Sequence, residues 1–313
     1  MSAPIVTIAG GVGAARFLTG LLQVVPARDC TAIVNVGDDV ELHGLWVSPD
    51  LDTVTYTLAG AIDPERGWGL AGETWTAMEA LSRYGGITWF NLGDRDLATH
   101  LYRTQRRREG ASLSEVTSEI VRAWGLALHV LPVTDDRVET RVTLADTGDD
   151  VNFQEYFVKH RHGVPLRDVR FAGVADARPG PGVVESIAGA AAIVIAPSNP
   201  LVSIAPVLAV PGVRDAVAAR RDHTVAVSPI VGGAALKGPA DRMLVELGHE
   251  SSVLGIARLY CDLASVLVID GVDAEHAAAV EQLGLRCIVT DTIMKSPERA
   301  AALARTVVAA AGV

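Results

Sequence analysis

Four aspartates lie in one glycine- and proline-containing segment, residues 35–53, and their spacing could bring several carboxylates to one point. The segment follows an apolar run at residues 32–34, which is typical of a buried strand. Two carboxylates about 5 Å apart repel each other by roughly 3 kcal/mol at an effective dielectric constant of about 20, so a convergent group needs a cation. Because all of these ligands are oxygens, the expected ion is Mg²⁺. The candidate metal ligands are Asp38, Asp39, Asp50 and Asp52.

The alternative is a solvated acidic loop whose aspartates cap helices and stabilise turns. Asp52 is the clearest case, because it precedes a predicted helix at residues 54–61 and could be its N-cap. If the segment does chemistry, Asp50 and Asp52 are the candidates for a general base.

A glycine-rich turn near the start of the chain, GGVGAARF at residues 10–17, is a candidate phosphate-binding site. It follows an apolar run at residues 5–9 and precedes a predicted helix at residues 14–25, which is the opening of a nucleotide-binding α/β fold. Arg16 stands where the dinucleotide fingerprint needs its third glycine, and the turn lacks the G-K-[ST] ending of a Walker A loop. A packing turn is the alternative. The candidate anion-binding residues are Gly10, Gly11, Gly13 and Arg16.

Several polar segments follow predicted strands, and the carboxyl ends of parallel strands share one edge of a sheet. One of them, after a predicted strand at residues 88–91, places Arg95 between two acids, which favours a positioned guanidinium. No G-x-S-x-G elbow or Cys/His pair indicates a covalent nucleophile. The combination favours metal-assisted phosphoryl transfer to an acceptor substrate. The segments are residues 10–16, 35–52, 93–96, 197–203 and 228–233.

The remaining pattern predicts one α/β domain over residues 1–313, with a Rossmann-like, mostly parallel sheet and helices on both faces. Two insertions are expected, a helical one at about residues 62–125 and an antiparallel β-ribbon or small antiparallel sheet at about residues 128–160. A capping box at Ser112 and Glu115 opens the last helix of the first insertion. Further strands are predicted at residues 192–196, 224–227, 266–269 and 287–289, and a final helix at residues 297–310.

Composition excludes several classes of protein. Of the 313 residues, 49% are hydrophobic, which is enough for a full core, and the formal net charge of -10 argues against binding to nucleic acid. The one basic run, residues 103–108, is interpreted as the solvated face of a helix. Three separated cysteines indicate a reducing compartment, and without an apolar leader or membrane-length run a cytoplasmic location is expected.

Taken together, the motifs resemble those of the 2-phospho-L-lactate transferase family (CofD/FbiA type). The likeness extends from about residue 5 to residue 294, and the motifs that carry it are GGVGAARF, NVGDD, SPDLDTVTYTLAG, ERGWG, LGDRDLATHL, LPVTDD, FQEYFV, APSNPLVSI and VSPIVGG.

This resemblance implies a Mg²⁺-dependent step in the biosynthesis of the deazaflavin coenzyme F-420, in a Rossmann-like homodimer. In that family a ribityl hydroxyl of the deazaflavin Fo attacks the phosphorus of a guanosine diphospho-acid, and GMP leaves. The four aspartates match the metal and Fo region, Asn91 and Arg95 match a second Fo-contacting segment, and Ser198, Asn199 and the glycine turn match the nucleotide-phosphate side. Asn35 and Asp94, in the same motifs, are added as substrate-binding candidates.

Arg16 and the NVGDD motif look more like the actinobacterial form of the family, which implies an enolpyruvyl donor first and a phospholactyl donor second. Two other functions remain open: a non-catalytic regulator that binds nucleotide sugars, and an NAD-dependent oxidoreductase. The clustered aspartates argue against the regulator, and Arg16 in place of the third glycine argues against the oxidoreductase.

Overall fold

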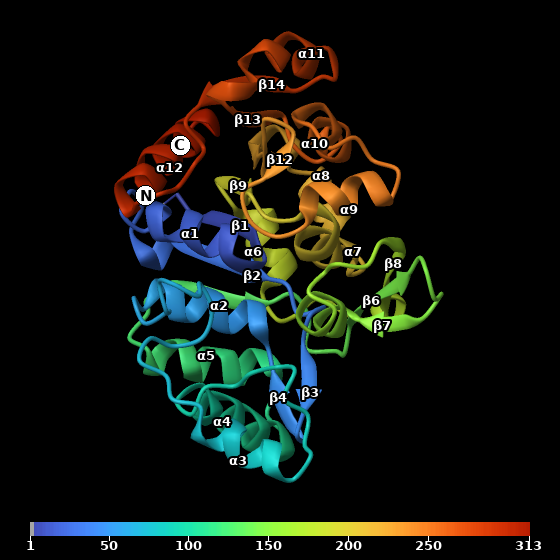
Figure 1. The fold of residues 1–313 in the computed structure, drawn as a ribbon. Coiled ribbons are helices and arrows are strands. Elements are labelled where there is room, and N and C mark those ends of the chain that lie inside the picture. Colours follow the sequence, from blue (N-terminus) through green and yellow to red (C-terminus); the bar gives the residue numbers. More distant parts are fainter. Residues whose placement is uncertain (1–2) are drawn as a thin grey trace.

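Seven short apolar segments form a central sheet in which every neighbouring pair is parallel. The computed structural model describes residues 3–313. Helices flank the sheet (Figure 1), and several of its strands are buried along their whole length, as the apolar runs predict. The predicted Rossmann-like class is confirmed. In sheet order the strands are β14 (Arg286–Thr290), β13 (Val266–Asp270), β10 (Thr224–Val227), β9 (Ala192–Ile195), β1 (Ile5–Ala9), β2 (Cys30–Val34) and β5 (His129–Pro132).

The chain changes its direction across the sheet at β1. From β1 it proceeds to β2 and β5 on one side, and later to β9, β10, β13 and β14 on the other. Ile8 of β1 therefore pairs with Ile33 of β2 and with Ile195 of β9. Open parallel sheets bind ligands outside the carboxyl ends of their strands at such a switch point. The turns that follow β1, β2 and β9 consequently meet at one place.

The helices around the sheet pack against one another, and Figure 1 shows α1 between α12 and α2. α1 contacts both α2 and α12, whereas α6 contacts α8. The approach of α1 to α12 is close, because a Cβ on Gly20 would lie 2.2 Å from the carbonyl carbon of Ala300. Among the described residues, no helix is long and apolar enough to cross a membrane. These helices are α1 (Gly11–Leu21), α2 (Pro49–Leu58), α6 (Val183–Gly189), α7 (Ala205–Ala209), α8 (Val213–Ala218), α9 (Ala240–Glu246), α10 (Val253–Tyr260), α11 (Ala277–Gln282) and α12 (Pro297–Ala310).

The acidic segment is more ordered than a connecting loop. A hairpin of β3 (Val40–Leu42) and β4 (Leu45–Val47) occupies its middle, and its turn residues His43 and Gly44 both have positive φ angles. α2 then begins at Pro49, well before the predicted start at residue 54, because proline is favoured in the first turn of a helix. The predicted boundary is therefore wrong, and the last two aspartates lie inside the first turn of α2.

The helical insertion exists as predicted and contains α3 (Thr76–Arg83), α4 (Asp96–Arg108) and α5 (Leu113–Ala123), with the expected capping box at Ser112 and Glu115. The strand predicted at residues 88–91 is wrong, since this stretch has no regular secondary structure. Its apolar side chains pack elsewhere: Phe90 and Leu92 join Met78 and Val47 in a small separate cluster. The segment at residues 93–96 therefore does not follow a strand of the central sheet.

A three-stranded antiparallel sheet, with β6 between β7 and β8, confirms the predicted antiparallel excursion, although its bounds differ from residues 128–160. Residues 129–132 belong instead to the central sheet as β5, where they pair with β2. Residues 155–159 form a helical turn, and the third strand lies beyond the predicted range. The strands are β6 (Glu139–Leu144), β7 (Asp150–Asn152) and β8 (Leu166–Ala172); β11 (Ile230–Val231) and β12 (Ala234–Ala235) form a separate small hairpin.

Candidate active site

Asp38 and Asp50 come together at the carboxyl end of the sheet. Asp38 lies in the turn after β2 and Asp50 in the first turn of α2, and both side chains are buried. Asn35 orients the second of these carboxylates, because its side-chain amide donates to Asp50 Oδ2 at 2.9 Å. The side-chain oxygen Oδ1 of Asn35 in turn accepts a hydrogen bond from the Gly37 backbone N–H at 2.7 Å. Asn35 is thus a buried link between the end of β2 and the start of α2.

The glycine turn lies directly against Asp50. A Cβ on Gly10 would be 3.1 Å from Asp50 Oδ2, and one on Gly11 would be 3.6 Å from Asp50 Oδ1. A Cβ on Gly10 would also be 2.8 Å from the Cβ of Ser203, so a larger residue would collide there. The carboxylate therefore faces the N-terminus of α1, where backbone N–H groups favour negative charge.

The bend after β9 completes this corner. The Ser198 hydroxyl accepts a hydrogen bond from the Ala14 backbone at 3.1 Å, which ties the bend to the first turn of α1. A Cβ on Gly13 would lie 2.1 Å from the carbonyl oxygen of Pro197, so only glycine allows this approach. Asn199 has a local role, because its side-chain oxygen accepts from the Leu201 backbone at 2.9 Å. The structure thus brings the glycine turn, the acidic segment and the PSNP bend together, as predicted.

The electrostatics of the Asp38–Asp50 pair indicate a place for a cation. Burial, and then the charge of Asp50, raise the pKa of Asp38 well above its ordinary value. Burial raises the pKa of Asp50 to about 6, partly offset by its hydrogen bonds. Asp38 Oδ1 is buried and, among the described residues, has no hydrogen-bond partner. An unpartnered buried carboxylate oxygen beside a second carboxylate fits Mg²⁺, which is commonly bound by one or two carboxylates plus substrate phosphates.

Asp39 and Asp52 have different surroundings. Asp39 Oδ2 accepts hydrogen bonds from Trp46 Nε1 at 3.0 Å and from the Ser48 hydroxyl at 2.7 Å. Asp52 forms a bidentate ion pair with Arg103, whose Nη1 is 3.1 Å from Asp52 Oδ2. Across residues 3–313, no three His, Cys, Asp or Glu side chains are grouped to hold a metal ion. The predicted group of four ligands is therefore not present as one set, and the ion pair of Asp52 argues against its predicted metal role. Asp39 Oδ1 has no partner among the described residues, so the metal role of Asp39 stays a prediction.

The basic run at residues 103–108 differs from its interpretation as a solvated helix face. Its first member, Arg103, is 1% exposed, so the interpretation as a solvated face is wrong for this residue. A signal was present, because Asp96, His100 and Arg103 recur at helical spacing and share one face of α4. His100 Nε2 lies 3.3 Å from Asp96 Oδ2, and His100 Nδ1 lies 3.4 Å from Arg103 Nη1.

The second predicted contact segment forms a junction between helices. The Asp94 carboxylate accepts hydrogen bonds from the Thr76 and Ala77 backbones, both at 3.0 Å, and so satisfies the start of α3. Arg95 is exposed, and its guanidinium donates to the Ala71 carbonyl oxygen. Asn91 is also exposed, as is Arg16 on α1. Their predicted roles in substrate binding stay predictions.

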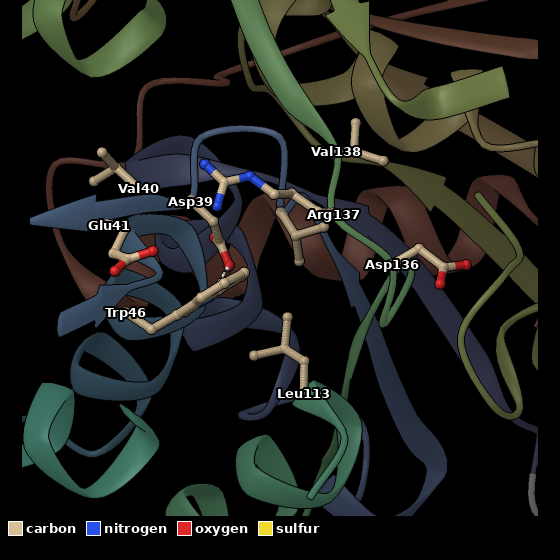
Figure 2. A pocket seen from close by; sticks show the side chains of 9 residues that line it. Asp39, Val40, Glu41, Trp46, Leu113, Asp136, Arg137 and Val138 are labelled. Carbon is tan, nitrogen blue, oxygen red and sulfur yellow. Dashed lines mark hydrogen bonds between the residues drawn. The ribbon is translucent and has the colours of Figure 1, made fainter. Parts of the chain in front are cut away.

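A recess beside Asp39 contains residues that the motifs did not single out. Figure 2 shows Trp46 next to Asp39, with Arg137 approaching from the irregular segment that precedes β6. Two guanidinium groups lie over the Trp46 ring, that of Arg107 at 5.2 Å and that of Arg137 at 5.7 Å from its centroid. The recess is lined by Val36, Asp39, Val40, Glu41, Trp46, Leu113, Asp136, Arg137 and Val138.

Comparisons with known proteins cover almost the whole chain. Residues 5–308 match the family 2-phospho-L-lactate transferase CofD. A phosphoenolpyruvate transferase of Streptomyces griseus is 47% identical over 305 residues, which is 96% of each chain. Proteins of the same name from Kitasatospora aureofaciens and Mycolicibacterium smegmatis are 46% identical over 312 residues and 40% identical over 323 residues, covering 97% or more of each chain.

Solved structures agree on the fold. A crystal structure of a Bacillus halodurans protein has a TM-score of 0.65 at 17% identity and covers 98% of this chain and 99% of its own. A second structure from that organism, described as a member of the UPF0052 family, has a TM-score of 0.61 at 16% identity, with the same coverage. Because the family match spans nearly every residue and full-length relatives reach 47% identity, the chain belongs to the 2-phospho-L-lactate transferase CofD family.

Proposed function

We propose that this protein transfers a phospho-organic-acid group from a guanosine diphospho-acid to the ribityl hydroxyl of the deazaflavin Fo, with release of GMP, in the biosynthesis of coenzyme F-420. Enolpyruvyl-phosphate is the group that we rank first, and 2-phospho-L-lactate is the second candidate. The name phosphoenolpyruvate transferase, carried by relatives that are 40% to 47% identical, supports this order. A cytoplasmic homodimer is part of the same proposal.

The observation that carries the proposal is the unpartnered oxygen of Asp38 beside Asp50, next to the glycine turn. Asp38 and Asp50 would hold Mg²⁺, and Asn35 keeps Asp50 in place for it. When bound there, the ion would supply charge neutralisation to the carboxylate pair and to the phosphates of the donor.

The other residues of the corner bind and orient the two substrates. The N–H groups at the start of α1, next to Ser198, are suited to the diphosphate of the donor. The hydroxyl oxygen of Fo forms a bond to the phosphorus that carries the organic acid, and the bond from that phosphorus to the bridging oxygen breaks, so that GMP leaves with this oxygen. Of the two aspartates predicted as general base, Asp52 is paired with Arg103, which leaves Asp50 to accept the hydroxyl proton.

The experiment is incubation of the protein with Fo, Mg²⁺ and either guanosine diphospho-acid, with products identified by mass. A gain in the mass of Fo together with GMP supports the transfer, and the faster donor identifies the acid. Asp38→Asn and Asp50→Asn should both lower turnover by about 10²–10³-fold, whereas Asp215→Asn, at an exposed position on α8, should not change it. Binding of nucleotide sugars without turnover, or binding of NAD(H) alone, would contradict the proposal.

A further inference from the structure

Arg103 is a buried cation in contact with the acidic segment. It is the largest of the fully buried side chains, and its guanidinium donates to both oxygens of Asp52. The residue comes from α4, in the helical insertion, and Asp52 is 51 positions away along the chain. Arg103 Nη1 also lies 3.4 Å from the carbonyl oxygen of Trp46, at the hairpin. One guanidinium thus joins the insertion, the hairpin and the first turn of α2.

Asp39 lies close enough to Asp52 for the two charges to interact. Trp46 links the two groups, because its backbone oxygen accepts from Arg103 and its ring nitrogen donates to Asp39. Burial raises the pKa of Asp39 to about 7, and its hydrogen bonds from Ser48 and Trp46 and the positive charge of Arg103 act against this rise. Asp39 Oδ1 is buried and, in the part of the chain that the structure describes, has no hydrogen-bond partner. Arg103 is thus paired directly with Asp52 and is linked to Asp39 through Trp46.

The geometry of α2 separates these carboxylates from the other two. Asp50 and Asp52 are two residues apart in the first turn, which places them about 200° apart around a helix of about 3.6 residues per turn. Asp50 consequently faces the glycine turn, and Asp52 faces α4. The four aspartates form two pairs, Asp38 with Asp50 and Asp39 with Asp52, and the second pair contains the buried guanidinium.

We propose that Arg103 is the resident cation of this acidic segment, neutralising Asp52 so that only Asp38 and Asp50 bind an exchangeable divalent ion. Four carboxylates in one segment could otherwise hold two metal ions, which lie about 3.5–4 Å apart in two-metal sites. A guanidinium remains charged at every accessible pH and fits a carboxylate in a fixed bidentate geometry, so it is a permanent substitute for a second ion. Arg103 is a positioning residue, which acts through Asp52 on α2. The inference depends on the proposed metal site.

The test counts metal ions and does not rely on turnover alone. Mn²⁺ bound per chain in the presence of GDP is measured by electron paramagnetic resonance for the wild type, Arg103→Met, Arg103→Lys and the double variant Arg103→Met with Asp52→Asn. We expect one ion in the wild type and a second ion in Arg103→Met, whose uncompensated carboxylates attract it. Arg103→Lys keeps the charge and should keep one ion. The double variant loses one charge of each sign and should also bind one.

Turnover provides a second measurement. Arg103→Met should lower kcat by about a hundredfold, which is the loss expected from a misplacement of about 1 Å, with little change in the KM of the donor. The double variant should recover most of this loss, because it removes one charge of each sign and so restores the net charge of the segment. A purely structural ion pair would change thermal stability without changing the number of bound ions.

Separate outcomes identify which idea fails. If the wild type binds no Mn²⁺ in the presence of GDP, the proposed metal site is wrong. If wild type and folded Arg103→Met both bind one ion, only the role of Arg103 is wrong. If Arg103→Met does not fold, the double variant and Arg103→Lys test the role of Arg103. Both keep the wild-type net charge, so a second bound ion in either would contradict the proposal.

Discussion

Two pairs of aspartates from one short segment have opposite surroundings. Asp50 faces a turn of backbone N–H groups, and a buried oxygen of Asp38 has no partner within the described chain. Side-chain donors contact the other pair: an indole and a hydroxyl bind one oxygen of Asp39, whose second oxygen has no partner in the described residues, and a guanidinium binds both oxygens of Asp52. The comparison shows that residue type and spacing assign a carboxylate to a region of the fold, whereas the donors opposite it decide whether it binds a ligand or stabilises the scaffold.

The largest expected effect is on turnover and tests whether the two pairs differ in function. Asp50→Asn removes a charge from the pair that faces the glycine turn, and we expect kcat to fall by about 10²–10³-fold, as for the loss of one key electrostatic group. The loss should be measured at saturating Mg²⁺ with each donor. Asp215→Asn is the matched control. A fully active Asp50→Asn would remove the distinction between the pairs.

The second prediction concerns the glycine turn that faces Asp50. Gly13→Ala places a methyl group against the Pro197 carbonyl oxygen, so α1 must move away from the bend, and we expect a loss of about 3 kcal/mol or more in unfolding free energy together with weaker donor binding. Gly189→Ala is the control, because a Cβ there meets nothing within 4 Å. Chemical denaturation and titration with GDP measure the two effects. Equal behaviour of the two variants would show that the close approach is unimportant.

The third prediction uses the pH dependence of stability. The pKa of Asp50 is raised to about 6 in the folded protein, so this group binds more protons when folded than when unfolded. Its contribution to unfolding free energy is therefore present below about pH 4 and is lost as the pH rises through about 6, a change on the order of 3 kcal/mol. Metal-free protein should be less stable at pH 8 than at pH 5, and Mg²⁺ should stabilise it more at pH 8.

Calorimetry at the two pH values, with and without Mg²⁺, measures this difference. Asp50→Asn should reduce it, because the variant lacks the titrating group. Asp215→Asn should leave it unchanged. A wild-type protein whose stability rose steadily from pH 5 to pH 8 without metal would contradict the electrostatic description of the Asp38–Asp50 pair.

The smallest effect is expected at the other pair. Trp46→Phe removes the indole donor of Asp39 but keeps an aromatic ring beside Arg107 and Arg137, so we expect a loss of about 1–3 kcal/mol in stability from the unsatisfied carboxylate. Turnover should change much less than in Asp50→Asn. Urea denaturation provides the stability, and a kcat loss as large as that of Asp50→Asn would place Asp39 in the catalytic pair.

Much of this protein follows from local sequence. Apolar runs at residues 5–9, 192–196 and 266–269 predicted buried parallel strands, because such strands are covered on both faces and read as continuous hydrophobic stretches. Polar turns after those strands predicted a site at one edge of the sheet. The strand predicted at residues 88–91 was wrong, because a short apolar stretch can equally well pack in a small cluster outside the central core.

Tertiary structure alone decided the partners of the aspartates. All four lie in one segment of the sequence. The guanidinium that pairs with Asp52, however, belongs to a residue 51 positions away, in a basic run that was interpreted as solvent-exposed. The position of that helix depends on long-range packing, and a local pattern carries no information about what lies opposite a side chain. The sequence therefore determined the fold class and the location of the acidic corner, and folding determined which carboxylates are neutralised and which remain available to bind.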